Sequence, residues 1–191
     1  MTAELYHFLY KGLTLKTVGL VMGAALLIGH LVALLKPDQV KGWLKALPRN
    51  EKFGLVLVAI DFAWALLVWS EMDLGEFYNV ERPVQLILIL GCIGVMTYVR
   101  EFLAVRAIGF FFILAAAPIL NAAFLEPPIS RLLLVALSYA WILIGMFWVG
   151  MPYLMRDQIN WLLAEPKRWK PAALGGLVYG ALVLVCAVAF Y

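Results

Sequence analysis

The sequence predicts an all-α integral membrane protein with about six transmembrane helices. Of its 191 residues, 65% are hydrophobic and 14% are charged, whereas soluble domains are about 45–50% apolar and about 25% charged. Six apolar runs approach the length of about 20 residues that crosses a bilayer. Basic residues are concentrated in the segments between these runs. A soluble fold of this length cannot bury so much apolar surface, so we expect lipid to cover part of it.

The six apolar runs are residues 13–35, 53–70, 83–99, 107–125, 132–151 and 171–191. Prolines mark most of the boundaries between them, as expected where helices begin and end. Pro118 instead lies inside the fourth run and predicts a kink there. The third run is short, and its helix either ends near Val99 or continues through Arg100 and Glu101. No connection is long enough for a soluble domain, so residues 1–191 are expected to form one transmembrane domain of three hairpins.

Lysine and arginine are unequally distributed between the two sides of the predicted membrane. One side carries Lys36, Lys41, Lys45, Arg49, Lys52, Arg100, Arg106, Arg156, Lys167, Arg168 and Lys170. The other side carries only Lys11, Lys16, Arg82 and Arg131. Because basic residues are enriched in cytoplasmic connections, the first side is expected to be cytoplasmic. Both termini are then exoplasmic, and the expected location is a bacterial inner membrane.

Two of the cytoplasmic connections repeat one sequence pattern. Residues 38–49 and 157–167 both read Asp-Gln-(Val/Ile)-x-Trp-Leu-x-Ala-x-Pro-basic once one residue is deleted from the first. The echo suggests a hairpin repeat of residues 13–70 and 132–191, related by an axis along the membrane normal. Chance similarity between two loops of similar composition is the alternative.

The repeated segments also have the pattern of amphipathic helices. Val40, Leu44 and Leu47 follow helical spacing together with Trp43, and the lysines lie off this stripe. Such a helix is expected to lie at the cytoplasmic headgroup level, with Trp43 and its counterpart Trp161 as interfacial anchors. The lipid bilayer is therefore the expected partner, and bound lipid is the expected ligand.

Asp61 is the strongest candidate for a functional residue. It lies near the middle of the second apolar run, where an ionised carboxylate costs roughly 2.5–3.5 kcal/mol on insertion scales. The group must be protonated, paired or exposed to a wet cavity. One interpretation is a group that handles protons or cations. The other is a buried hydrogen bond to Thr97, Ser138 or Tyr139.

Five further polar residues are candidates for the same polar path: His30, Arg100, Glu101, Arg106 and Asn121. His30 either pairs with a carboxylate or is a packing residue. The three charged residues crowd the turn after the third run, forming either an ion-paired turn or a gate at the cytoplasmic mouth. Asn121 either satisfies backbone groups freed by the Pro118 kink or lines a polar cavity.

Glycines spaced four residues apart occur in both the first and the last apolar run. They are Gly19 and Gly23 in the first run, and Gly176 and Gly180 in the last. Small residues at this spacing let helix backbones approach closely. We expect these two helices to pack together or to contact another subunit.

The sequence contains none of the common hydrolase, kinase or metal-binding motifs. His7, the only other histidine, belongs to the opposite side from His30, which argues against a bis-histidine haem. We expect no metal, haem or pigment and no nucleic-acid partner.

The leading hypothesis is a channel or transporter for a proton, ion or small solute, assembled as a homo-oligomer or with other membrane subunits. The alternatives are a non-catalytic subunit or scaffold of a membrane complex, and an intramembrane lipid- or quinone-handling enzyme. The enzyme would need Asp61, His30 and Glu101 to converge.

The predicted orientation can be tested by cysteine labelling in a chain whose Cys92 and Cys186 are replaced by alanine. Single cysteines at Thr2 and Tyr191 should react with a membrane-impermeant maleimide from the exoplasmic side. A cysteine at Lys45 should react only after permeabilisation. A terminus that is labelled only from the cytoplasm would contradict the assignment.

Overall fold

The computed structural model describes residues 2–72 and 75–191, and these contain helices and no strands. The α-helices are α1 (Thr2–His7), α2 (Leu15–Leu35), α3 (Pro37–Ala46), α4 (Glu51–Ser70), α5 (Glu81–Tyr98), α6 (Leu103–Ala123), α7 (Leu132–Gly150), α8 (Tyr153–Ala164) and α9 (Pro166–Ala189). Short helical segments are η1 (Phe8–Gly12), η2 (Leu47–Arg49), η3 (Gly75–Val80) and η4 (Ile129–Arg131). The prediction of an all-helical chain with six membrane-spanning helices is confirmed at this level, because α2, α4, α5, α6, α7 and α9 are each long and apolar enough to cross a membrane.

Local sequence explains where several of these helices begin. The hydroxyl of Thr14 accepts a hydrogen bond from the backbone N–H of Thr17 at the start of α2, and Asn50 caps α4 in the same way. Proline occupies the first position of α3 and of α9, where it costs no backbone hydrogen bond. The last span begins at Pro166, five residues before the start predicted at residue 171. The third span ends at Tyr98, so it does not continue through Arg100 and Glu101.

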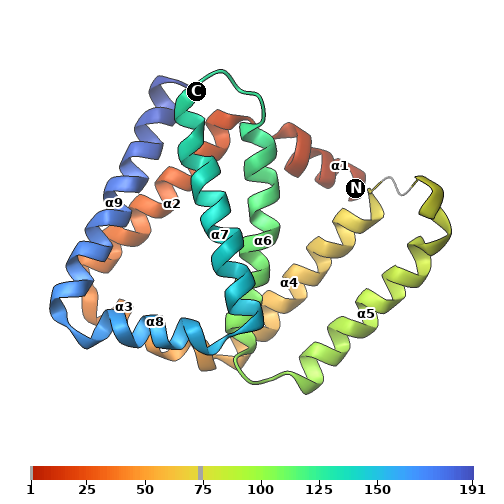
Figure 1. Ribbon diagram of the computed structural model, residues 1–191, viewed down its shortest axis with the longest axis horizontal. Coiled ribbons are helices and arrows are strands. Elements are labelled where there is room, and N and C mark those ends of the chain that lie inside the picture. Colours follow the sequence, from red (N-terminus) through yellow and green to blue (C-terminus); the bar gives the residue numbers. More distant parts are fainter. Residues whose placement is uncertain (1, 73–74) are drawn as a thin grey trace.

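The most extensive helix contact joins α2 to α9, which lie side by side along their length (Figure 1). A Cβ atom added at Gly23 would lie 2.8 Å from the backbone nitrogen of Leu184, and one at Gly180 would lie 2.7 Å from that of Leu27. All four glycines of the two spaced pairs face the opposite helix: Gly19, Gly23, Gly176 and Gly180. The missing side chains are what allow the two backbones to approach this closely.

The expected packing of the spans as three hairpins is not confirmed. Those hairpins would have paired α2 with α4, α5 with α6 and α7 with α9, whereas the principal contacts join α2 to α9, α6 to α7 and α4 to α6. Helix α5 packs less extensively, chiefly on α4. At two of the three expected hairpins, a helix in the connection explains why the flanking spans do not pack together. Helices α3 and α8 contain 10 and 12 residues, so they separate their flanking spans by roughly 15–18 Å, beyond the 8–10 Å of direct helix packing.

Helices α3 and α8 cross the same end of the bundle next to each other (Figure 1). Val40 and Leu44 of α3 and Leu162 and Leu163 of α8 are partly buried against a core cluster that includes Trp169. Trp43 and Trp161 instead face outward, with 56% and 61% of their surface exposed. The candidate repeat of residues 13–70 and 132–191 stays a prediction. Its two halves differ in their surroundings, because α6 packs between α4 and α7 whereas α2 and α9 contact each other directly.

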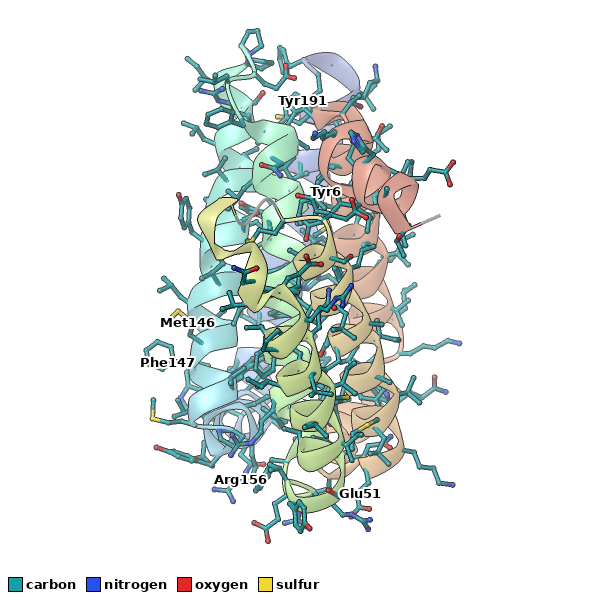
Figure 2. The ribbon with its side chains drawn as sticks, turned by 90° about the vertical axis from the view of Figure 1, so that its right-hand side faces the viewer. Tyr6, Glu51, Met146, Phe147, Arg156 and Tyr191 are labelled. Carbon is teal, nitrogen blue, oxygen red and sulfur yellow. The ribbon has the colours of Figure 1, made fainter. Side chains whose placement is uncertain are left out.

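The outer surface of the spans is apolar. Figure 2 shows Met146 and Phe147 of α7 pointing away from the rest of the molecule, and both side chains are exposed. Helix α5 has no buried residue at all. Charged residues such as Glu51 and Arg156 lie at one end of the molecule, and Tyr191 lies at the other (Figure 2). This distribution is the one expected of helices surrounded by lipid.

The close contact of α2 with α9 predicts a position-specific cost for added side chains. Gly180→Leu should lower the free energy of unfolding by about 1–3 kcal/mol or more, because the new side chain must displace the backbone of α2. Gly175→Leu in the same helix is the matched control, because its Cβ would meet no atom within 4 Å. Unfolding in mixed detergent micelles, followed by circular dichroism, gives both values. Equal losses for the two variants would contradict the role of Gly180.

Candidate functional site

Asp61 lies in the contact between α4 and α6. Gly54, Val58 and Asp61 are all buried and follow helical spacing, so they share one face of α4. A Cβ added at Gly54 would lie 2.7 Å from the backbone nitrogen of Ala104 on α6. The face that carries Asp61 is therefore pressed against α6, and only 4% of the surface of Asp61 is exposed.

The carboxyl group of Asp61 has no hydrogen-bond partner among the described residues. Both of its oxygen atoms are buried, and no described residue donates to either. None of the three partners expected from the sequence bonds to Asp61. The hydroxyls of Ser138 and Thr97 donate to carbonyl oxygens of their own helices, at 2.9 and 2.8 Å, and Tyr139 is exposed. The interpretation of Asp61 as a hydrogen-bonded link between helices therefore lacks the bond that it requires.

His30 and Glu101 do not join Asp61. The Nδ1 atom of His30 donates to the carbonyl oxygen of Leu26 at 2.7 Å, and the ring fills the space that a side chain at Gly176 would occupy. His30 thus belongs to the contact of α2 with α9. Glu101 is exposed in the turn between α5 and α6. The structure therefore does not bring together the three residues that an intramembrane enzyme would need.

The charged turn forms a cavity rather than an ion pair. Arg100, Glu101 and Arg106 line a cavity of about 430 Å³ together with Thr97, Tyr98 and Val99. Within the described residues, no ion pair joins Glu101 to either arginine. The Nη1 atom of Arg106 donates to the carbonyl oxygen of Val149 at 2.8 Å, while its Nε is buried without a partner. Arg106 thus satisfies a carbonyl at the C-terminal end of α7, where a cation is favoured.

Phe102 closes this turn in a strained conformation. Its φ angle is 55°, which places a bulky residue in the left-handed region and costs roughly 1–2 kcal/mol. The ring lies 5.9 Å from the guanidinium of Arg156 on α8. This contact links the turn to α8.

A second cavity, of about 610 Å³, lies near the other end of α4. It is lined by residues of α1, η1, α4 and α5, and its polar side chains are Thr2, Trp64, Ser70 and Gln85. The indole N–H of Trp64 donates to the hydroxyl of Tyr10 at 3.1 Å. Burial raises the pKa of Tyr10, so the phenol keeps its proton. Its O–H can donate onward, because its oxygen is the acceptor of the bond from Trp64.

Asp61 lies between the levels of these two cavities along α4. Gly54 lies opposite Ala104, and the ring of Trp64 packs edge-on against Phe111, with centroids 5.9 Å apart. From this register, Asp61 lies about one turn below Trp64 and roughly 7 Å above the level of Arg106. The intervening surface is apolar, since Val58 and Ala107 belong to one buried cluster there.

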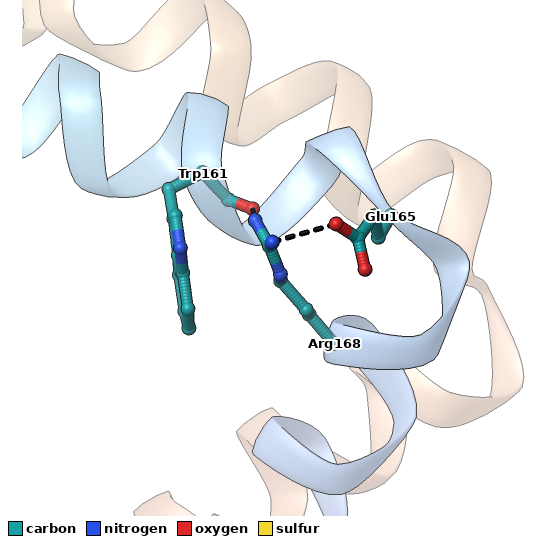
Figure 3. Close-up of polar contacts among 3 residues, drawn as sticks. All are labelled: Trp161, Glu165 and Arg168. Atoms are coloured by element: carbon teal, nitrogen blue, oxygen red, sulfur yellow. Dashed lines mark hydrogen bonds and ion pairs between the residues drawn. The ribbon is translucent and has the colours of Figure 1, made fainter.

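The remaining residues predicted from the sequence lie apart from Asp61. Asn121 is exposed, and its side chain makes no hydrogen bond within the described part of the chain. Trp161 stacks with the guanidinium of Arg168, at 4.5 Å. Arg168 also donates to the carbonyl oxygen of Trp161 and to the carboxylate of Glu165, at 2.9 and 2.6 Å (Figure 3). These contacts fix the junction between α8 and α9.

Trp169 is an organising residue that the sequence did not single out. It is buried, and its indole N–H donates to the carbonyl oxygen of Ala33 at 3.1 Å. The ammonium of Lys41 lies 5.3 Å from the centroid of its ring. Trp169 lies between Arg168 and Lys170, in a segment that the sequence predicts to be a polar connection. A tryptophan among basic residues next to a span is typical of the membrane interface, and this pattern could have identified it.

In comparisons with known proteins, no family model matches the chain, and no curated protein or solved structure matches it. Within the described residues, no group of three or more histidine, cysteine, aspartate or glutamate side chains is arranged to hold a metal ion. The description of the candidate site therefore rests on the residues around Asp61 and not on a related protein or a metal cluster.

The unpartnered carboxyl group predicts that Asp61 destabilises the fold. Asp61→Val should raise the free energy of unfolding by about 1–3 kcal/mol, because a buried polar group without a hydrogen bond is replaced by an apolar one of similar size. Val58→Ala on the same face should lower it, as the loss of buried methyl groups does. Micelle unfolding measures both variants. A loss of stability in Asp61→Val would show that the carboxyl group has a stabilising partner.

Proposed function

We propose that this protein passes protons across a membrane, with Asp61 as the group that takes up and releases each proton. The observation that carries the proposal is the burial of both carboxyl oxygens of Asp61 without a partner in the contact of α4 with α6. Ionisable residues inside membrane spans are costly and typically mark ion or proton pathways. A purely structural role does not explain the buried carboxyl group, because no hydrogen bond offsets the free-energy cost of burying it.

The surroundings of Asp61 favour a proton over a metal cation. Val58 and Ala107 supply no oxygen ligands, and a dehydrated metal cation would need several. A carboxyl group carries a proton without further ligands. The cavity at Trp64 and the cavity at Arg106 bring solvent-accessible space to within one or two helical turns of Asp61 on either side. Transient water across these short intervals would complete the path.

The orientation proposed from the basic residues assigns a side to each cavity. Helices α3 and α8 then lie at the cytoplasmic headgroup level, with the exposed rings of Trp43 and Trp161 in the interface. The charged cavity at Arg100 and Arg106 opens toward the cytoplasm. The cavity beside Tyr10 and Trp64 opens toward the exoplasmic side, as do both termini. A bacterial inner membrane supplies the proton gradient that such a conduit would use.

A second candidate function is that of a subunit in a larger membrane complex, and α5 favours it. This span has no buried residue and packs chiefly on α4. Side chains added at Gly91 or Gly94 would meet no atom within 4 Å. Small residues on an open helix face permit close approach of another span. A second copy of this chain, or a different membrane subunit, would cover that face, and this role is compatible with proton passage.

Proton flux into liposomes tests the main proposal. With a potassium diffusion potential and an internal pH-sensitive dye, the wild-type protein should acidify the lumen faster than empty liposomes do. Asp61→Asn keeps the shape of the side chain but removes its titratable proton, so flux should fall by more than about tenfold. Asp38→Asn, the same change in α3, should leave flux unchanged. Wild-type flux no higher than that of empty liposomes, or full flux in a folded Asp61→Asn protein, would refute the proposal.

A further inference from the structure

A third cavity, of about 240 Å³, is lined by residues of the α2–α9 pair and of the connection helices α3 and α8. Its walls are formed by four helices, and its lining is Gly29, His30, Ala33, Val40, Leu44, Leu162, Trp169, Ala172 and Ala173. The lining is almost entirely apolar. Its two polar side-chain N–H groups are already used, because Trp169 donates to Ala33 and His30 donates to Leu26. The cavity therefore suits a hydrocarbon segment rather than a polar ligand.

The rim of this cavity is cationic. The ammonium of Lys41 is held 5.3 Å from the centroid of the Trp169 ring, which forms part of the cavity wall. Lys45 follows four residues later and so lies on the same face of α3. Neither lysine forms an ion pair with a carboxylate in the part of the chain that the structure describes. Arg168, by contrast, is already paired with Glu165.

We infer that this cavity binds one anionic phospholipid, with an acyl chain against the apolar walls and the phosphate beside Lys41 and Lys45. Charge complementarity selects the occupant, since two unpaired ammonium groups at the mouth of an apolar cavity match a molecule that joins a phosphate to a hydrocarbon chain. A volume of about 240 Å³ holds part of one chain, being smaller than the roughly 300–1,000 Å³ of sites for whole drug-sized ligands.

The lipid would act as a structural ligand. Contacts between α3 and the α8–α9 segment are few, and Val40, Leu44 and Leu162 leave the cavity between them. A chain in this space would fill the gap between the α2–α9 pair and the connection helices. The site is separate from Asp61, which lies on α4, so the inference does not depend on proton passage.

Native mass spectrometry of the detergent-purified protein tests the inference with two probes that share the same acyl chains, palmitoyl-oleoyl phosphatidylglycerol and palmitoyl-oleoyl phosphatidylcholine. Wild-type protein should bind the anionic lipid at least fivefold more tightly. Lys41→Gln should weaken binding of phosphatidylglycerol by about fivefold and leave phosphatidylcholine unchanged, since one interfacial cation is lost. Lys16→Gln, at the other end of α2, is the matched control and should change neither.

A second pair of variants tests the cavity itself. Gly29 lines the cavity, and a Cβ added there would meet no atom within 4 Å, so Gly29→Leu should fill the space without disturbing the fold and weaken both lipids severalfold. Gly91→Leu, on the open face of α5, should not. Three results would overturn the inference: equal affinity of the wild type for both lipids, Gly29→Leu binding lipid like the wild type, or displacement of the lipid by soluble glycerol phosphate.

Discussion

The close contact between α2 and α9 is the constraint on which the arrangement of the other helices depends. Lipid removes most of the hydrophobic driving force between spans, so association relies on close van der Waals packing. Glycines on both helices provide that packing, with backbones so near that a single Cβ would collide. Because α2 and α9 are the first and last spans, their contact brings the two ends of the bundle together. It also forces the connections that leave them, α3 and α8, to run next to each other.

The connection helices then divide the spans into two groups. One group is the α2–α9 pair, and the other is the set α4, α5, α6 and α7. The groups meet near the termini through a buried cluster that includes Val18, Ile119 and Val183, and they meet at the opposite end through α3 and α8. A helix of ten or more residues cannot bend back on itself, so the groups stay apart between these two points. The lipid site that we infer lies between the α2–α9 pair and the connection helices, whereas the proposed proton path lies in the larger group and the N-terminal segments α1 and η1 that pack on it.

Three described residues of the larger group, Asp61, Phe102 and Leu125, are placed against local preference. Asp61 is buried without a hydrogen-bond partner among the described residues, and Phe102 and Leu125 have positive φ angles that bulky residues rarely adopt. Features of this kind are kept where the surrounding structure enforces them, and they are concentrated at functional sites. Asp61 lies between the charged cavity and the cavity beside Trp64, and Phe102 lies in the turn at the level of the charged cavity, whereas Leu125 follows the other end of α6. The position of Asp61 and Phe102 beside this route supports a functional interpretation of the contact between α4 and α6.

The sequence by itself determined the helical class, the number of candidate spans and the existence of a polar residue among apolar ones. These follow from local properties, because each span must satisfy its own backbone and present an apolar surface to lipid. The spaced glycines already favoured packing of the first and last spans, and tertiary structure alone decided the other pairings. It also decided that Asp61 has no partner and that Lys41 meets Trp169 from a distant part of the chain. The pairing could not be read from hydropathy, because it depends on how far apart α3 and α8 hold their neighbours. That separation becomes a physical constraint only once the connections are folded as straight helices.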